Sequence, residues 1–187
     1  LAQTVKQCKA TISYPPNGLP MLLYGPTGTG KSLIAKLTYE WARNQGVISK
    51  DGQFLQVNCS EYANNPELLT ANLFGHVKGA FTGAEKDNEG LIALADNGVL
   101  FLDEVHELKA ECQEKLFLFM DQGIYHRVGD NEKWYKSNVR IVFATTENPD
   151  KVLLKTLMRR IPMTITIPSL EQRGTQERIE LLHNIFS

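Results

Sequence analysis

The sequence predicts a three-layer α/β fold with a mainly parallel sheet of five strands. Two observations lead to this prediction. Short apolar segments recur along the chain, and amphipathic stretches of helical length lie between them. The 187 residues are 42% hydrophobic and 22% charged, which is the composition of a folded domain with one substantial core. Strands that alternate with helices form parallel sheets, because each helix carries the chain back to the edge where the previous strand began.

The elements follow from the apolar pattern, taken in order. Strands are expected where apolar residues run together, as in strands that are covered on both faces; they fall at residues 21–24, 53–57, 99–102, 139–144 and 163–167. Helices are expected at residues 1–12, 31–45, 107–122, 151–159 and 175–186, with one more after Asn65-Pro66. A hairpin is expected from residues 124–128 and 134–136. The side chains expected to face inward are Leu33, Ile34, Leu37 and Trp41 on the helix at 31–45, and Leu108, Leu116 and Phe119 on the helix at 107–122.

The charge balance argues against a strongly basic nucleic-acid-binding protein, although a local basic patch remains compatible with it. The chain has 20 Lys+Arg and 21 Asp+Glu, a formal net charge of -1. Cys8, Cys59 and Cys112 have no zinc-binding spacing and are expected to be buried thiols in a reducing compartment. Neither a signal peptide nor a membrane-spanning run is present, so we expect a cytoplasmic protein without a membrane partner. Because the chain begins with Leu1, we expect it to be part of a longer protein.

A glycine-rich loop follows the first predicted strand. Residues 25–32 read Gly-Pro-Thr-Gly-Thr-Gly-Lys-Ser, which matches the P-loop pattern between a strand and a helix. Such a loop directs backbone N–H groups and the positive end of a helix at phosphate oxygens. We expect Lys31 to reach the β- and γ-phosphates of ATP and Ser32 to hold Mg²⁺. The expected nucleotide-binding residues are Gly25, Pro26, Thr27, Gly28, Thr29, Gly30, Lys31, Ser32 and Leu33.

Two carboxylates follow the third predicted strand. Asp103 and Glu104 come directly after Val-Leu-Phe-Leu, at the strand end where ligands bind in open α/β sheets. We expect Asp103 to hold Mg²⁺, directly or through water, and Glu104 to polarise the attacking water as a general base. The segment continues as Asp-Glu-Val-His, a D-E-x-H box of some helicases, so a nucleic-acid motor is an alternative function. Helicases of that class carry two such domains, and no role is assigned to His106.

A second glycine-rich segment carries a family resemblance. Residues 79–84 resemble the signature of the bacterial sigma-54-dependent transcription activators, a branch of the AAA+ ATPases. Its phenylalanine has only small neighbours to bury it, which suits a loop that contacts another protein. The resemblance implies a P-loop NTPase fold, with an AAA+ core at residues 1–173 and a truncated helical lid at 174–187. It also implies contact with sigma-54 through Gly79, Ala80, Phe81, Thr82, Gly83 and Ala84.

Three other segments resemble functional positions of that family. Residues 139–146 resemble its sensor I strand, with Thr146 in place of the usual asparagine. Residues 157–161 resemble its arginine-finger segment, where Arg160 matches the second finger and Arg159 can substitute for the first. Asn58 resembles a switch residue that holds Glu104 away from water until nucleotide and the sigma-contacting loop are coupled.

The nearest resemblance is to the LevR-type subgroup, which regulates sugar phosphotransferase-system operons; it rests on residues 74–79, 145–149 and 159–162. The resemblance implies a bacterial Mg²⁺-dependent ATPase that assembles into a homo-oligomeric ring, a hexamer in the family. The ring would remodel the RNA polymerase holoenzyme containing sigma-54, while DNA is contacted through other domains of the full protein. The altered sensor position leaves another alternative, a regulatory module that binds ATP and hydrolyses it weakly.

Overall fold

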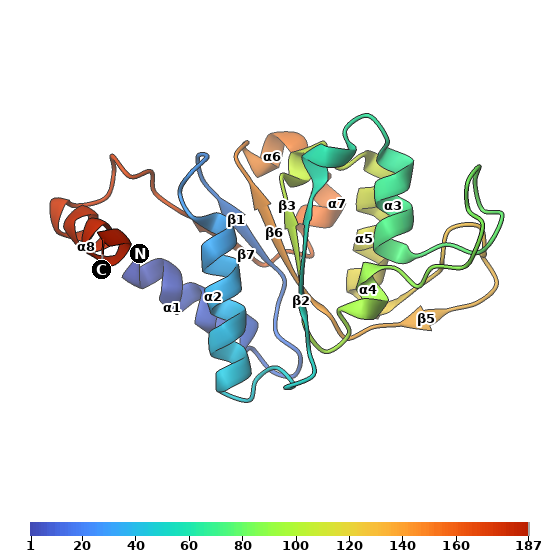
Figure 1. Cartoon of the computed structure of the whole chain (residues 1–187), viewed down its shortest axis with the longest axis horizontal. Coiled ribbons are helices and arrows are strands. Elements are labelled where there is room, and N and C mark those ends of the chain that lie inside the picture. The colour runs from blue at the N-terminus through green and yellow to red at the C-terminus, as the bar shows by residue number, and fades with distance from the viewer. Residues whose placement is uncertain (187) are drawn as a thin grey trace.

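A parallel sheet forms the centre of the computed structural model, which describes residues 1–186 (Figure 1). Within that range the sheet has five strands in the order β2-β3-β6-β1-β7, and each neighbouring pair is parallel. The predicted three-layer α/β fold is therefore confirmed. The strands are β1 (Met21–Tyr24), β2 (Phe54–Asn58), β3 (Val99–Asp103), β6 (Arg140–Thr145) and β7 (Met163–Thr166).

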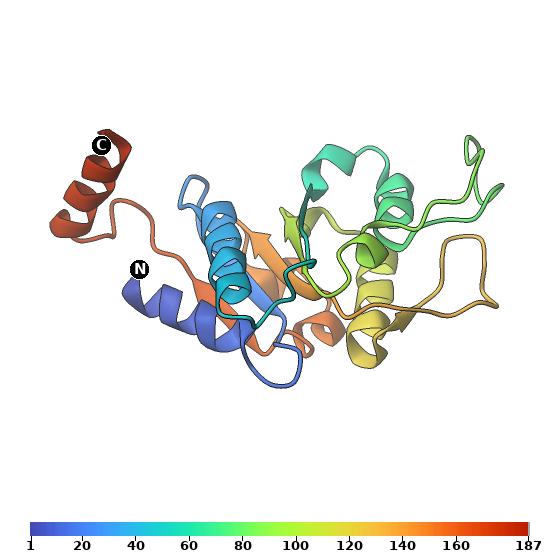
Figure 2. The same ribbon diagram turned by 60° about the horizontal axis from the view of Figure 1, so that its bottom comes forward.

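Helices cover both faces of this sheet, as Figures 1 and 2 show. The α1 and α2 helices pack on one face, and α3, α5 and α7 pack on the other. The helices are α1 (Ala2–Ile12), α2 (Lys31–Asn44), α3 (Pro66–Phe74), α4 (Leu91–Leu94), α5 (Ala110–Gln122), α6 (Pro149–Val152), α7 (Lys155–Met158) and α8 (Thr175–Phe186). Two 3-10 turns, η1 (Cys59–Tyr62) and η2 (Val105–Glu107), follow β2 and β3. The helix predicted from residue 107 thus begins later, at Ala110.

Alternate residues of β1, β3 and β6 enter two separate apolar cores. On β3, Leu100 and Leu102 pack with the α3 and α5 side, whereas Val99 and Phe101 pack with α1 and α2. This alternation follows from the two-residue period of a strand. It explains the uninterrupted apolar runs in the sequence, since both faces of the sheet are covered.

The inward face of α2 differs from the prediction. Leu33 and Leu37 are 58% and 52% exposed, while Ala35 and Ala42 are buried against the sheet. The small side chains let the helix lie close to the sheet. The hydroxyl of Tyr39, also on α2, donates to the carbonyl of Gly52 at 2.7 Å. The larger leucines are consequently left on the outer side of the helix. Of the four side chains predicted to face inward, Ile34 and Trp41 pack against the core as predicted, whereas Leu33 and Leu37 do not.

The helix predicted at residues 151–159 is divided into α6 and α7. The backbone is extended at Leu153 and Leu154, between the two short helices. The cause is a buried amide on α5: Gln113 accepts a hydrogen bond from the N–H of Leu154 at 2.8 Å and donates one to the carbonyl of Leu108 at 2.9 Å. Because Gln113 satisfies the backbone N–H of Leu154, the chain can leave the helix there without a buried unpaired donor.

Two connected projections extend from the end of the molecule farthest from α8 (Figures 1 and 2). One is the loop at residues 75–90; the other is the hairpin formed by β4 (Ile124–Tyr125) and β5 (Tyr135–Lys136), which pair antiparallel as predicted. Their stems are joined, because Val77 N–H donates to Val128 O at 3.1 Å and Val128 N–H donates to Gly75 O at 2.9 Å. The two ends of the loop at residues 75–90 also lie close together, because a Cβ on Gly75 would be 2.5 Å from the backbone oxygen of Asn88 and one on Gly90 would be 2.3 Å from the backbone nitrogen of Gly75.

The three cysteines are free and buried, as predicted. Burial raises the pKa of Cys8 and Cys59, and it raises the pKa of Cys112 to about 11. The thiols therefore stay protonated and unreactive in the fold. None of the described helices is both long and apolar enough to cross a bilayer.

Candidate nucleotide site and projecting loop

The glycine-rich loop connects β1 to the first turn of α2. Gly28 and Gly30 have φ angles of 78° and 87°, in the left-handed region that favours glycine. Gly30 is the residue at the N-terminus of α2, so the loop ends where the helix directs its free N–H groups and positive dipole. A Cβ at either glycine would meet no atom within 4 Å, which leaves open space beside the loop. The loop thus has the backbone geometry of an anion cradle, as predicted for residues 25–32.

The ammonium group of Lys31 lies within this loop. Its Nζ donates to the carbonyl oxygens of Gly25 and Pro26 at 2.7 and 2.9 Å. Burial lowers the pKa of Lys31, and the nearby carboxylates of Asp103 and Glu104 oppose that change. The structure therefore brings the lysine of the first motif and the acids of the second motif into electrostatic contact. To bind a phosphate, the ammonium group would exchange these two carbonyl hydrogen bonds for bonds to phosphate oxygens.

The two acidic residues lie at the carboxyl end of β3. Asp103 is the last residue of the strand, and its Oδ1 accepts a hydrogen bond from the N–H of Glu104 at 2.9 Å. Glu104 has a φ of 54°, which costs a residue with a Cβ about 1–3 kcal/mol. Such a conformation persists only where the surroundings hold it in place. It turns the Glu104 carboxylate towards the end of β6.

Side chains from η2 and from the residue after β6 contact that carboxylate. The hydroxyl of Thr146 donates to Glu104 Oε2 at 3.4 Å, and Nε2 of His106 lies 3.2 Å from the same oxygen. The other ring nitrogen of His106, Nδ1, is 3.1 Å from Oγ1 of Thr145. The sequence prediction left His106 without a role, and the D-E-x-H spacing was the signal that pointed to this position.

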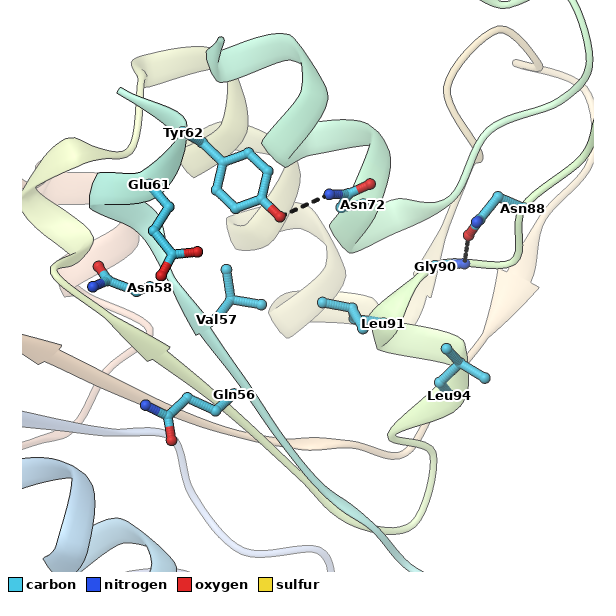
Figure 3. Close-up of a pocket in the computed structure, with 10 residues that line it drawn as sticks. All are labelled: Gln56, Val57, Asn58, Glu61, Tyr62, Asn72, Asn88, Gly90, Leu91 and Leu94. Carbon is cyan, nitrogen blue, oxygen red and sulfur yellow. Dashed lines mark hydrogen bonds between the residues drawn. The ribbon is translucent and has the colours of Figure 1, made fainter. Parts of the chain in front are cut away.

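The side chain of Asn58 is hydrogen-bonded to Ser60 rather than to Glu104. It stands opposite Asp103 in the parallel register of β2 and β3, but its Oδ1 accepts from the N–H and hydroxyl of Ser60 at 3.1 and 2.7 Å. Figure 3 shows Asn58 beside Glu61 at the wall of a cavity of about 550 Å³ between β2, α3 and α4. The described conformation therefore has Asn58 capping η1, and the switch assignment stays a proposal.

The glycine-rich segment at residues 79–84 forms the tip of the projecting loop. Gly79 N–H donates to Ala84 O at 2.8 Å, which closes the tip into a turn. Phe81 is 37% exposed and packs edge-on against His76, with 4.9 Å between ring centroids. On the neighbouring hairpin, Trp134 is exposed and lies over His126 at 3.6 Å. The loop tip and the hairpin therefore each present one aromatic group that the domain itself covers only in part.

Comparison with known proteins identifies the family. Residues 1–165 match the family model described as the sigma-54 interaction domain. The chain belongs to this family. It is 52% identical to the transcriptional regulatory protein LevR of Bacillus subtilis over 181 residues, which cover 97% of this chain and 19% of LevR. It is 45% identical to the transcriptional regulatory protein DagR of Salmonella typhimurium, covering 97% of this chain and 19% of DagR. The chain thus spans about a fifth of these two relatives.

Solved structures agree with this assignment. NtrX from Brucella abortus in complex with ADP superposes with a TM-score of 0.76 at 26% identity, over 98% of this chain and 38% of NtrX. NtrX in complex with ATP gives a TM-score of 0.73 over 99% of this chain and 40% of NtrX, again at 26% identity. The fold of this sigma-54 interaction domain is therefore that of an AAA+ core, as predicted.

The residues present in this sigma-54 interaction domain fit Mg²⁺ and a nucleoside triphosphate. A lysine ammonium, the N-terminus of a 14-residue helix and an open glycine-lined loop suit phosphate oxygens. The hydroxyl of Ser32 and the carboxylate of Asp103 are oxygen ligands of the kind that Mg²⁺ prefers. No other donor type is needed at such a site.

Of the two arginines predicted as fingers, Arg160 packs against α5. Arg160 forms an ion pair with Asp121 at 3.4 Å, and its guanidinium lies 4.4 Å from the ring centroid of Phe117. Arg159 is exposed. Exposed ion pairs contribute only about 0–1 kcal/mol, so Arg160 can exchange Asp121 for another anion at small cost.

A buried arginine that the motif analysis did not select supports the P-loop of this sigma-54 interaction domain. Arg173, 7% exposed, donates from NH2 to the carbonyl of Thr29 at 2.6 Å and from Nε to the carbonyl of Pro168 at 3.3 Å. It lies between β7 and α8, so it joins the end of the core to the nucleotide loop. Its only sequence signal was its position at the end of the predicted core, directly before the predicted lid at residues 174–187.

Proposed function

We propose that this domain hydrolyses Mg-ATP and uses the hydrolysis to remodel RNA polymerase containing sigma-54, so that promoter DNA can open. The observation that carries the proposal is the arrangement of two sites on one framework. The P-loop and the acidic pair meet at the carboxyl edge of the sheet, while the Gly-Ala-Phe-Thr-Gly-Ala tip is held at the end of a separate projection. The family model and the similarity to transcriptional regulators support the same function.

The roles of the residues follow from their chemistry. Lys31 neutralises the β- and γ-phosphates, and Ser32 and Asp103 hold Mg²⁺, which neutralises charge on the phosphates when bound. Glu104 accepts a proton from the attacking water. Thr146, whose hydroxyl donates to that carboxylate, would take the role of the family's sensor asparagine by donating to the γ-phosphate instead.

The ring is part of the proposal. Arg160, with Arg159 beside it, would complete the site of a neighbouring subunit, because a planar guanidinium stabilises the charge that develops on a transferred phosphoryl group. Its partner Asp121 is partly exposed and easily exchanged. We further propose that a lid begins at residue 174 and that α8 is its first helix. We also propose that the protein acts in the cytoplasm and that it regulates phosphotransferase-system operons, as the similarity to LevR suggests.

The conclusive experiment separates ATP hydrolysis from work on the polymerase. Phe81→Ala should leave the ATPase rate within about twofold of the unaltered protein, because no nucleotide group touches the tip, and should abolish open-complex formation by sigma-54 polymerase. Tyr14→Ala, which also removes an exposed aromatic ring but far from the tip in the sequence, is the matched control. Lys31→Ala should abolish both activities. Open complexes formed by Phe81→Ala at the normal rate would disprove the assignment of the loop.

A further inference from the structure

His106 lies near the carboxyl ends of β3 and β6, beside the proposed nucleotide site. It lies on η2, directly after β3, and its side chain is only 13% exposed. Its Nδ1 lies 3.1 Å from the hydroxyl oxygen of Thr145, the last residue of β6, which is fully buried. Its Nε2 lies 3.2 Å from Oε2 of Glu104. The imidazole ring therefore bridges the end of β6 and the glutamate that follows β3.

The surroundings decide which nitrogen carries the proton. Three carboxylates face Nε2, with Glu104 nearest at 3.2 Å, Glu107 at 3.8 Å and Glu147 at 3.9 Å. An unprotonated Nε2 would direct its lone pair at these acids, which is unfavourable. Both the neutral ring protonated at Nε2 and the doubly protonated ring donate a hydrogen bond to Glu104. In the neutral ring protonated at Nε2, the hydroxyl of Thr145 lies where it can donate to Nδ1, so this contact is compatible with the tautomer that the three acids favour.

We propose that His106 is a positioning residue: it donates a hydrogen bond from Nε2 to the Glu104 carboxylate and holds that general base at the end of β6, beside Thr146. The consequence for the rate rests on the proposed ATPase function; the contact itself does not. Glu104 needs such support because its backbone is in the strained left-handed region. Thr145 orients the ring in the way that a third group orients the histidine of other catalytic pairs.

The first measurement tests the contact without hydrolysis. Nitrogen-15 NMR of the imidazole rings at pH 7.5 should show His106 protonated at Nε2, with the signal assigned by its loss in His106→Gln. Glu104→Gln should shift that signal, while Glu132→Gln, an exposed carboxylate two residues beyond the Asp130 turn, should not. A His106 ring protonated only at Nδ1 would overturn the proposal, and so would a signal that Glu104→Gln leaves unchanged.

The second measurement tests the effect on the reaction. His106→Ala should lower kcat about 10- to 100-fold, because a small displacement of a general base is costly, while the Kd of a non-hydrolysable ATP analogue stays within about twofold. His106→Gln places its amide N–H where Nε2 lies and should restore most of kcat. His106→Asn places its amide near Nδ1, can reach Thr145 but not Glu104, and should not restore it. Thermal unfolding of all three variants checks the fold.

The outcomes separate this proposal from the proposed function. If Glu104→Gln retains full hydrolysis, or if the unaltered protein hydrolyses no ATP, the proposed function fails while the NMR result still reports on the contact. If Glu104→Gln abolishes hydrolysis but His106→Ala has an unchanged or higher kcat, only the positioning role fails. Rescue by His106→Asn instead of His106→Gln also disproves it, because the ring would then act through Thr145 alone.

Discussion

Arg173 is the clearest place to test how the end of the core controls nucleotide binding. Its guanidinium is buried, carries a full charge, and donates to the backbone of the P-loop at Thr29 over 2.6 Å. Replacing it with alanine leaves the Thr29 carbonyl without this partner. The loop then loses its link to the segment between β7 and α8.

The magnitude follows from the type of bond. A hydrogen bond from a charged donor contributes about 1.5–3 kcal/mol. Without Arg173, the loop would take this conformation only when phosphate binds, and the binding free energy would have to supply the lost stabilisation. The Kd of Arg173→Ala for ATP should therefore rise by roughly 10- to 100-fold. Arg173→Lys keeps the charge but not the planar pair of donors that reaches Thr29 and Pro168 together, so we expect an intermediate loss.

The assay is titration calorimetry with a non-hydrolysable ATP analogue in the presence of Mg²⁺. The matched control is Arg178→Ala, which removes an exposed arginine whose hydrogen bonds go to the carbonyls of Leu170 and Glu171, outside the P-loop. That variant should bind with unchanged affinity. Equal affinity for Arg173→Ala and the unaltered protein, with the fold intact, would refute the argument that Arg173 orders the loop.

Three more predictions concern other parts of the domain. The ATPase rate per subunit should rise with protein concentration and stay low at all concentrations in Arg160→Ala; a flat profile in the unaltered protein would contradict completion of the site by a neighbour. At pH 8, Cys112 should react with a thiol reagent far more slowly in the folded than in the urea-unfolded protein, since a pKa of about 11 leaves little thiolate; equal rates would show the thiol to be accessible. Gly98→Ala should lower the free energy of unfolding by about 1–3 kcal/mol in urea titrations, because the added Cβ would lie 2.1 Å from the backbone oxygen of Gln53, the residue before β2. The control, Gly174→Ala, has no atom within 4 Å and should change stability little.

The sheet could be predicted from the sequence because strand burial leaves a direct signal. Strands covered on both faces carry apolar runs, as β1 does, and as β3 and β6 do at residues 99–102 and 141–144. The helices were predicted less well, because their packing depends on partners far away in the sequence. Gln113 ends α6 from a position 41 residues away from Leu154, and α2 turns its alanines rather than Leu33 and Leu37 towards the sheet.

The candidate site divides in the same way. The P-loop and the Asp103–Glu104 pair are contiguous motifs, and the order of the strands brings them together as predicted. The contributions of His106 and Arg173 were missed because each depends on a pair of atoms that only the fold brings into contact, 39 and 144 residues apart in sequence. Asn58 shows the converse: its motif position suggested a switch, whereas the described conformation gives it a local capping bond.

The joined stems of the two projections have a mechanical consequence. Motion at the base of the loop is restricted in two ways. Residues 75–77 are hydrogen-bonded to Val128, and the backbone segments at Gly75 and Gly90 lie in close contact. Phe81 and Trp134 therefore sit on one stiff arm rather than on two independent tethers. Because the loop continues directly from α3, a small tilt of that helix would produce a larger displacement at the far end of the arm. A force applied to either aromatic ring would be transmitted to the stem that both projections share.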